Sequence, residues 1–345
     1  MMSTTRLSCK IAVLAIAAVP ANAQAASLFD RNHTLSITIE APIRQLLRHR
    51  TSDEEYDAVL SYTDAAGVRH RLNFILTTRG RSRLELCKFP PLRLTFNPDD
   101  TGATIFEGQR RLKMVTQCEK GSNGKSWVLQ EFGIYRAYNA ISDFSYRVRR
   151  LEVTFRDTDS KRWQQVQPAF LIESTGAAAR RLQRKSIRPS QINPNQFSPV
   201  ETTHNLLFQF LIANTDFSVR RGSSGEGCCH NGRVLAVSDR LSDWVVLPYD
   251  FDRAGIINTD YAIPHNKLPI SRVTSRLYRG FCWQNTMLPL SIAMFNLNRS
   301  KITDALLPAG LGKTKRKRAL NYIDRFYKIV NDPRQYEKQI LDKCR

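Results

Sequence analysis

Short runs in which apolar and polar residues alternate fill much of the first half of the chain. A period of two is typical of β-strands with one buried face. Turn signals such as residues 64–67 separate the runs. The runs cover residues 35–39, 57–62, 92–96, 112–115, 150–155 and 169–173. We therefore expect an antiparallel sheet in a β-rich N-lobe, residues 26–185.

Apolar residues at helical spacing come between the fourth and fifth of these runs and dominate the second half. Phe132, Tyr135, Tyr138 and Ile141 share one face of a helix predicted over residues 130–141. A polar stretch with two prolines, residues 186–195, reads as a connection or a long loop. It precedes a predicted helix at 204–213, a buried strand at 244–249, and helices beyond Pro289. The fold class we expect is α+β, with a mainly helical C-lobe over residues 186–345.

The N-terminus has the pattern of a cleavable signal peptide. A short basic segment, residues 1–10, precedes an apolar run at 11–19 that is too short to span a bilayer. Pro20 ends that run, and small residues place cleavage near Ala23 or Ala25. No later stretch is long and apolar enough to cross a membrane. We predict a signal peptide at 1–25 and a periplasmic or secreted protein.

Seven cysteines change the picture of the exported chain, because six remain once Cys9 leaves with the signal. An even number of cysteines outside the cytosol indicates disulfides. Cys87 and Cys118 flank neighbouring predicted strands and are the first choice for a pair. Adjacent Cys228 and Cys229 are expected to bond elsewhere rather than to each other. A zinc site is the alternative.

The chain is strongly basic, with 52 Lys and Arg residues against 31 Asp and Glu and a formal net charge of +21. Such a field favours anionic partners: phosphates, nucleic acid or envelope polymers. A solvated basic surface is the alternative, and it is also the preferred interpretation of the basic run at residues 313–318.

Two acidic segments follow buried elements that would fix their positions. Asp216 comes after the helix at 204–213, and Asp250 and Asp252 come after the strand at 244–249. Carboxylates in such places are costly unless solvated, hydrogen-bonded or bound to a cation. Mg²⁺ (or Mn²⁺) fits, because it takes one or two carboxylates and fills its other positions with water and phosphate. Asn231 offers a further oxygen ligand.

The order of the charged residues matches the parts needed for phosphoryl transfer. Lys113 would hold nucleotide phosphates and Glu131 would pair with it. Asp216 would orient or deprotonate the acceptor hydroxyl, and Asn231 with Asp250 would bind the metal. Capping of a turn by Asp216, and ion pairs of Asp250 and Asp252 with arginine, are the structural alternatives. His230 and His265 stay outside this catalytic set.

Several segments resemble the spore-coat-protein-H-like (CotH) atypical kinases, over about residues 70–260. The strongest is Pro-Tyr-Asp-Phe-Asp at 248–252, similar to that family's metal-binding aspartate, with Asn-Thr-Asp at 214–216 as the catalytic-loop counterpart. Residues 79–83 and 88–91 look like its Gly- and Lys-containing N-lobe segment. The resemblance implies a two-lobed protein-kinase-like fold that uses ATP and Mg²⁺. Lys88 or Arg93 could take the phosphate position given to Lys113.

Three functions follow, in order of preference. The first is an exported kinase-like phosphotransferase that moves phosphate from ATP to a hydroxyl on a protein or envelope polymer. The second is a catalytically inactive protein that binds an anionic polymer or another polyanion at the cell envelope. The third, a metal-dependent hydrolase, ranks lowest because the sequence offers no distinctive base to activate water.

Overall fold

The structure is a computed structural model that describes residues 28–222, 226–237 and 242–345. The predicted signal peptide and its cleavage point lie outside these residues. None of the helices in the described part of the chain is long and apolar enough to span a membrane.

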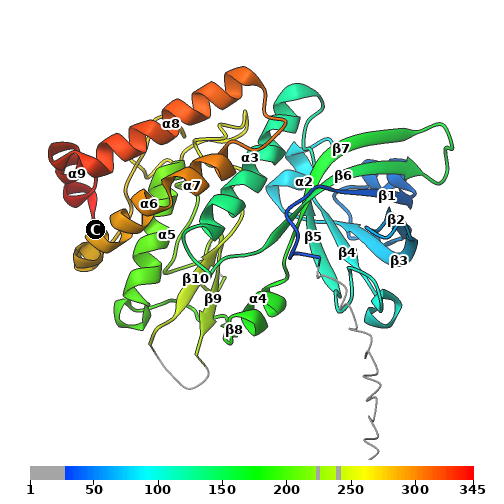
Figure 1. Ribbon diagram of the computed structural model, residues 1–345, viewed down its shortest axis with the longest axis horizontal. Helices are drawn as coiled ribbons and strands as arrows, with labels where there is room; N and C mark the ends of the chain where they lie inside the picture. The colour runs from blue at the N-terminus through cyan, green and yellow to red at the C-terminus, as the bar shows by residue number, and fades with distance from the viewer. Residues whose placement is uncertain (1–27, 223–225, 238–241) are drawn as a thin grey trace, which may run out of the picture.

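Seven strands form a closed barrel, which occupies one half of the molecule (Figure 1). In the order of their pairing they are β1 (Leu35–Ala41), β2 (Tyr56–Thr63), β3 (Arg69–Thr78), β4 (Leu92–Thr95), β5 (Arg111–Val115), β7 (Gln164–Ile172) and β6 (Val148–Asp157). Buried apolar side chains from all seven strands fill the interior, among them Ile39, Leu60, Leu76 and Phe155. The apolar side chains of the alternating runs therefore point into the barrel, as expected for strands with one buried face.

The expected protein-kinase-like fold with an antiparallel N-lobe sheet is wrong. The sheet closes on itself because β1 pairs with β6, and this pairing is parallel, with Leu35 opposite Leu151 and Ala41 opposite Asp157. The other barrel pairings are antiparallel. Closure hides both edges that an open sheet would leave unpaired. Alternation within a strand predicts which side chains point inward, but it does not say that the first strand meets the sixth.

Helices build the other half, around a second apolar core (Figure 1). The helices of at least seven residues here are α3 (Gly121–Asn139), α4 (Thr175–Arg181), α5 (Pro199–Ile212), α6 (Leu288–Leu297), α7 (Arg299–Leu306), α8 (Lys313–Asn331) and α9 (Pro333–Gln339). Two short helices, α1 (Ile43–Arg48) and α2 (Ser82–Leu86), belong to the barrel half. The inserted helix α3 begins nine residues before the predicted start at residue 130, and its buried face joins the second core.

A second, three-stranded sheet lies in the helical half. It consists of β8 (Lys185–Ile187), β9 (Gly232–Ala236) and β10 (Val245–Pro248), all antiparallel, with β9 in the centre. The polar stretch at 186–195, predicted as a connection, therefore contributes its first residues to a strand. The buried strand predicted at 244–249 is β10.

Three disulfides account for all six cysteines that the structure describes. Cys87 pairs with Cys118, as predicted, and Cys282 pairs with Cys344. Cys228 pairs with Cys229, so the expectation that these neighbours bond elsewhere is wrong. The peptide bond between them is cis, a conformation that the prediction, made for an ordinary backbone, did not include. The disulfides leave no thiolate for the alternative zinc site.

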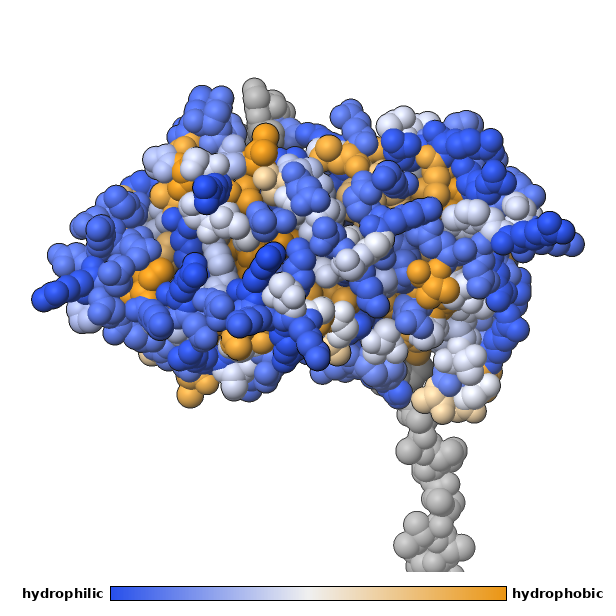
Figure 2. All heavy atoms as spheres, turned by 90° about the horizontal axis from the view of Figure 1, so that it is seen from above, coloured by the Kyte–Doolittle hydropathy of each residue, from blue (hydrophilic) through white to orange (hydrophobic). Residues whose placement is uncertain are grey.

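The face of the molecule shown in Figure 2 is mostly hydrophilic, with small separate hydrophobic patches. The basic run at 313–318 opens helix α8, and most of its side chains are exposed. That placement agrees with a solvated surface.

Helices α3 and α7 approach closely at Gly133. A Cβ atom there would lie 2.4 Å from the backbone oxygen of Ala305. We predict that Gly133→Ala lowers the free energy of unfolding by about 1–3 kcal/mol, because the helices must separate. Gly176→Ala in α4 is the control, since its Cβ would meet only the end of the Arg180 side chain, at 3.6 Å. Urea titrations should show the control unchanged or more stable by up to about 1 kcal/mol, and equal losses would contradict the close approach.

Candidate active site

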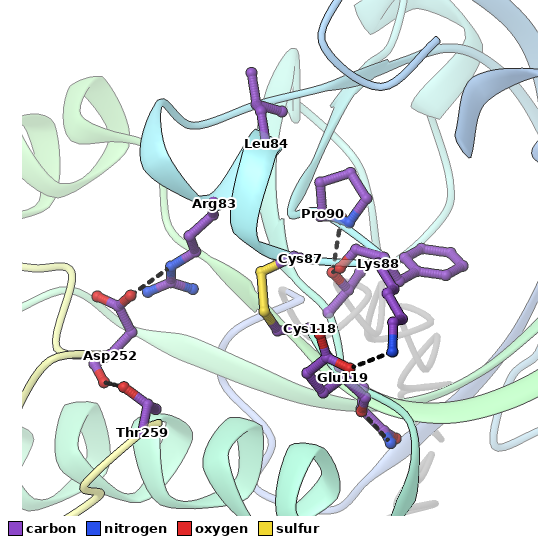
Figure 3. Close-up of a disulfide and its surroundings, with 12 residues drawn as sticks. Arg83, Leu84, Cys87, Lys88, Pro90, Cys118, Glu119, Asp252 and Thr259 are labelled. Carbon is purple, nitrogen blue, oxygen red and sulfur yellow. Dashed lines mark hydrogen bonds and ion pairs between the residues drawn. A yellow bond between two sulfur atoms is a disulfide. The ribbon is translucent and has the colours of Figure 1, made fainter. Parts of the chain in front are cut away.

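A buried arginine joins three carboxylates at the junction of the two halves. Arg83 lies on α2, with its side chain 10% exposed. Its Nη2 donates to Glu131 Oε1 at 3.1 Å and to Asp250 Oδ1 at 2.8 Å, while Nε donates to Asp252 Oδ2 at 2.9 Å. Figure 3 shows Arg83 reaching across to Asp252. A barrel-half helix, the inserted helix and the segment after β10 thus meet on one guanidinium group.

The neighbouring carboxylates explain why Arg83 stays charged although it is buried. Burial alone would lower the pKa of Arg83, but Asp252, Glu131 and Asp250 raise it well above the usual value. Burial also raises the pKa of Glu131, and the neighbouring Asp252 and Asp250 act in the same direction. Three carboxylates face one arginine, so the group is negative overall when all are ionised. Removing a partner from a buried pair leaves an uncompensated charge, which costs about 3–5 kcal/mol.

Asp216 and Asn231 form a second cluster. Asp216 follows the end of α5, and its backbone N–H donates to Asn214 Oδ1 at 3.0 Å. Its Oδ1 lies 2.9 Å from His230 Nε2. Asn231 Nδ2 donates to the Asp216 backbone oxygen at 2.7 Å and to Oδ2 at 3.2 Å. These contacts hold a carboxylate that is still 34% exposed in a fixed orientation.

The strand pair β9–β10 connects this cluster to Asp250. Asn231 directly precedes β9 and Tyr249 directly follows β10; the Tyr249 N–H donates to the Asn231 oxygen at 3.2 Å. Asp250 comes next, and its own N–H donates to the Tyr135 hydroxyl at 3.0 Å. Because antiparallel neighbours end side by side, Asp216, Asn231 and Asp250 lie in one region. The hydrogen bond to the Asp216 carboxylate raises the pKa of His230 most, and the charge of Asp250 raises it further.

A cluster of cations borders the same region, with Lys113 and Arg93 on barrel strands and Arg233 on β9. Lys113 on β5 is paired in register with Arg93 on β4, and its Nζ lies 4.9 Å from the centre of the Tyr249 ring. Arg233 lies over the same ring at 4.8 Å. Burial lowers the pKa of Lys113 to about 7, helped by Arg79, Arg233 and Arg93 and opposed by Asp250. Within the described residues, none of these four cations forms an ion pair with a carboxylate.

The sequence-predicted residues separate into those that meet and those that do not. Lys113, Arg93, Glu131, Asp216, Asn231, Asp250 and Asp252 all lie in or beside the region just described. Lys88 does not: its side chain is 73% exposed and pairs with Glu119 at 3.3 Å. Figure 3 shows that pair on the far side of the Cys87–Cys118 disulfide from Arg83. Glu131 pairs with Arg83 rather than with Lys113.

Sequence reasoning missed the residues that organise the region. Arg79 and Arg83 belong to residues 79–83, which resemble an N-lobe segment of the CotH kinases, but from the sequence alone neither arginine received a role. Arg233 carries no signal beyond its place in a strand. His230 was set aside, although its position beside Asn231 was a usable hint. The sequence around Arg83 contains no pattern that predicts a buried ion pair, because its partners lie far away in the chain.

The oxygen atoms fit a magnesium ion better than a metal with an all-protein cage. The described residues contain no group of three or more His, Cys, Asp or Glu side chains arranged to hold a metal. Mg²⁺ needs only one or two carboxylates, with water and phosphate completing the shell. Asp250, 41% exposed and with one oxygen on Arg83, and the amide oxygen of Asn231 suit that role. Asp252 is buried against Arg83 and suits it less well.

Comparison with known proteins adds no family to this geometry. No protein-family model matches the chain, and a search of curated proteins finds no match. The resemblance to the CotH kinases therefore stays a prediction, carried by the residues quoted for it.

The low pKa of Lys113 predicts a measurable pH dependence of stability. Between pH 7 and 10.5 the unfolded chain binds a proton that folded Lys113 has lost, so the free energy of unfolding should rise with pH by about 1 kcal/mol per unit from this residue. Lys113→Met should remove that rise. Urea titrations at pH 7 and pH 9 measure it.

The control is Lys317→Met, at an exposed lysine of α8. Its pH dependence should match that of the wild type. If the curves for Lys113→Met and the wild type run parallel, Lys113 is not held in a cationic, buried environment.

Proposed function

We propose that the protein is a phosphotransferase that moves a phosphoryl group from ATP, with Mg²⁺ or Mn²⁺, to a hydroxyl acceptor on a protein or envelope polymer. The observation that carries the proposal is the meeting of two unlike clusters. Asp216, Asn231 and Asp250 supply oxygen atoms. Lys113, Arg79, Arg93 and Arg233 supply positive charge and form no ion pair with a carboxylate of the described residues. Phosphoryl transfer requires both, because catalysis depends on positioning and on neutralising charge at the phosphates.

In this proposal Asp216 acts on the acceptor. Its carboxylate takes the proton of the acceptor hydroxyl as the acceptor oxygen bonds to the γ-phosphorus. The bond from that phosphorus to the bridging oxygen breaks, and ADP leaves with the electron pair. Asn231 and His230 keep the Asp216 carboxylate oriented through their hydrogen bonds. General-base assistance of this kind contributes about 10²–10⁴-fold to a rate.

The cations and Asp250 act on the donor. Lys113 and its arginine neighbours would hold the phosphates, and bound phosphate would favour protonated Lys113 over its neutral form. Asp250 and Asn231 would hold the metal ion, which neutralises charge on the phosphate oxygens. Arg83 positions Asp250 and takes no direct part.

The compartment proposed is the periplasm or the exterior of the cell. Three disulfides support it, since such bonds persist in oxidising surroundings. Export through the predicted signal peptide is consistent with them.

Two variants test the two roles separately. Asp250→Asn should lose the Mg²⁺-dependent part of ATP binding, measured by calorimetry with and without EDTA, because the charged ligand is gone. Asp216→Asn should bind ATP–Mg²⁺ within about threefold of the wild type but lower the ATP hydrolysis rate, with water as the acceptor, by about 10²-fold or more.

Asp304→Asn provides the matched control, at an exposed aspartate of α7. It should leave both measurements unchanged. A folded wild type that binds no ATP in the presence of either metal would refute the proposal, and so would an Asp250→Asn variant that binds ATP–Mg²⁺ as the wild type does.

A further inference from the structure

A cavity of about 330 Å³ lies beside the segment that follows Asp216 in the chain. Its lining consists of Ser218, Arg220, Arg221, Phe281 and Arg345. Three of the five lining residues are arginines and none is acidic. In the part of the chain that the structure describes, these three guanidinium groups form no ion pair with a carboxylate.

The backbone that carries these arginines is firmly held. The Ser218 N–H donates to the His230 oxygen at 3.0 Å, and the His230 N–H donates to the Arg221 oxygen at 3.1 Å. On the opposite wall, the Cys282–Cys344 disulfide fixes the last residues beside Phe281, and the Arg345 N–H donates to the Gly280 oxygen at 3.0 Å. The cavity is therefore built by two chain segments that are fixed independently.

The arginines are close enough to repel one another. Arg220 and Arg345 lie over the same Phe281 ring, at 5.9 and 5.7 Å from its centre. Burial lowers the pKa of Arg345, and the charge of Arg220 lowers it further. Arg279, behind the cavity, donates to the Thr215 and Phe217 oxygens at 2.6 and 2.8 Å. The charge of Arg345 also lowers the pKa of Arg279, after burial as the main cause.

We infer that this cavity binds a phosphate group of a ligand, at a site separate from the cation cluster around Lys113. Arginine offers paired N–H donors that match phosphate oxygens, and the bound anion would relieve the repulsion between Arg220 and Arg345. Phosphate carries up to two negative charges, which suits three cations better than a single carboxylate does. The inference does not depend on phosphoryl transfer at Asp216.

The size of the cavity indicates more than a lone phosphate ion. A water molecule takes about 30 Å³ in the liquid, and a phosphate group is only a few times larger. The cavity of about 330 Å³ therefore also admits part of the group that carries the phosphate. The exposed ring of Trp283 stacks on the Phe281 ring that lines the cavity, with 5.9 Å between the ring centres. A phosphate ester or a phosphate polymer would fit such a site.

Calorimetry with inorganic pyrophosphate tests the inference. Salt at about 150 mM screens general charge attraction, and EDTA prevents pyrophosphate from binding through a metal ion at the central site. Arg220→Gln/Arg221→Gln should weaken binding at least tenfold. Arg345→Gln alone, at the last residue of the sequence, should weaken it at least threefold and guards against misfolding of the double variant. Lys317→Gln/Arg318→Gln removes the same charge from exposed positions of α8 and should change the affinity less than twofold.

Each remaining result contradicts the inference. Absence of pyrophosphate binding in the folded wild type would exclude the site, and equal losses in both double variants would reduce it to general charge attraction. A loss seen only with Lys113→Gln would place the ligand in the central cluster instead. Citrate that binds as tightly as pyrophosphate would show that the cavity does not prefer phosphate.

Discussion

The ion pairs of Arg83 are the interaction on which the arrangement of the candidate site depends. This guanidinium group draws together Glu131 from α3, and Asp250 and Asp252 from the segment after β10. The partners come from two separate parts of the chain, α3 and the segment after β10, and the arginine stands in the barrel half. Buried charges of this kind tolerate little displacement, because a lost partner leaves a charge without solvent. The barrel and the helical half are therefore fixed to each other where chemistry is proposed.

That constraint decides the electrostatics of the surrounding region. Asp252 and Glu131 are buried against Arg83. Asp250 is the most exposed carboxylate of the three, and it faces the cation cluster around Lys113. Its charge favours protonation of Lys113, whereas burial and three arginines oppose it. Asp216 is held on the other side by Asn231 and His230. A bound anion would complete this balance, as the phosphate donor in the proposed function would.

The sequence predicted the elements better than it predicted their assembly. Alternation located six of the seven barrel strands, all but β3, and apolar spacing located α5, since both are local properties of the chain. The parallel pairing of β1 with β6 is not local, so an open kinase-like sheet was expected in place of a barrel. In the site, Asp216 and Asp250 were predicted from their places at the ends of buried elements, and Asn231 from the oxygen ligand that it offers. Arg83 was missed because an ion pair spanning 169 residues leaves no trace in its neighbours. The Cys228–Cys229 bond was missed because an ordinary backbone was assumed between the two cysteines.

A double-mutant cycle between Arg83 and Asp252 tests the central claim most directly. Free energies of unfolding are measured for the wild type, Arg83→Met, Asp252→Asn and the double variant. Each single change should cost about 3–5 kcal/mol, and the double variant should cost at least about 2 kcal/mol less than their sum. The exposed pair Lys88–Glu119 gives the control cycle, with a coupling of about 0–1 kcal/mol. Additive losses at Arg83 and Asp252, within about 0.5 kcal/mol, would show that this ion pair does not hold the two halves together.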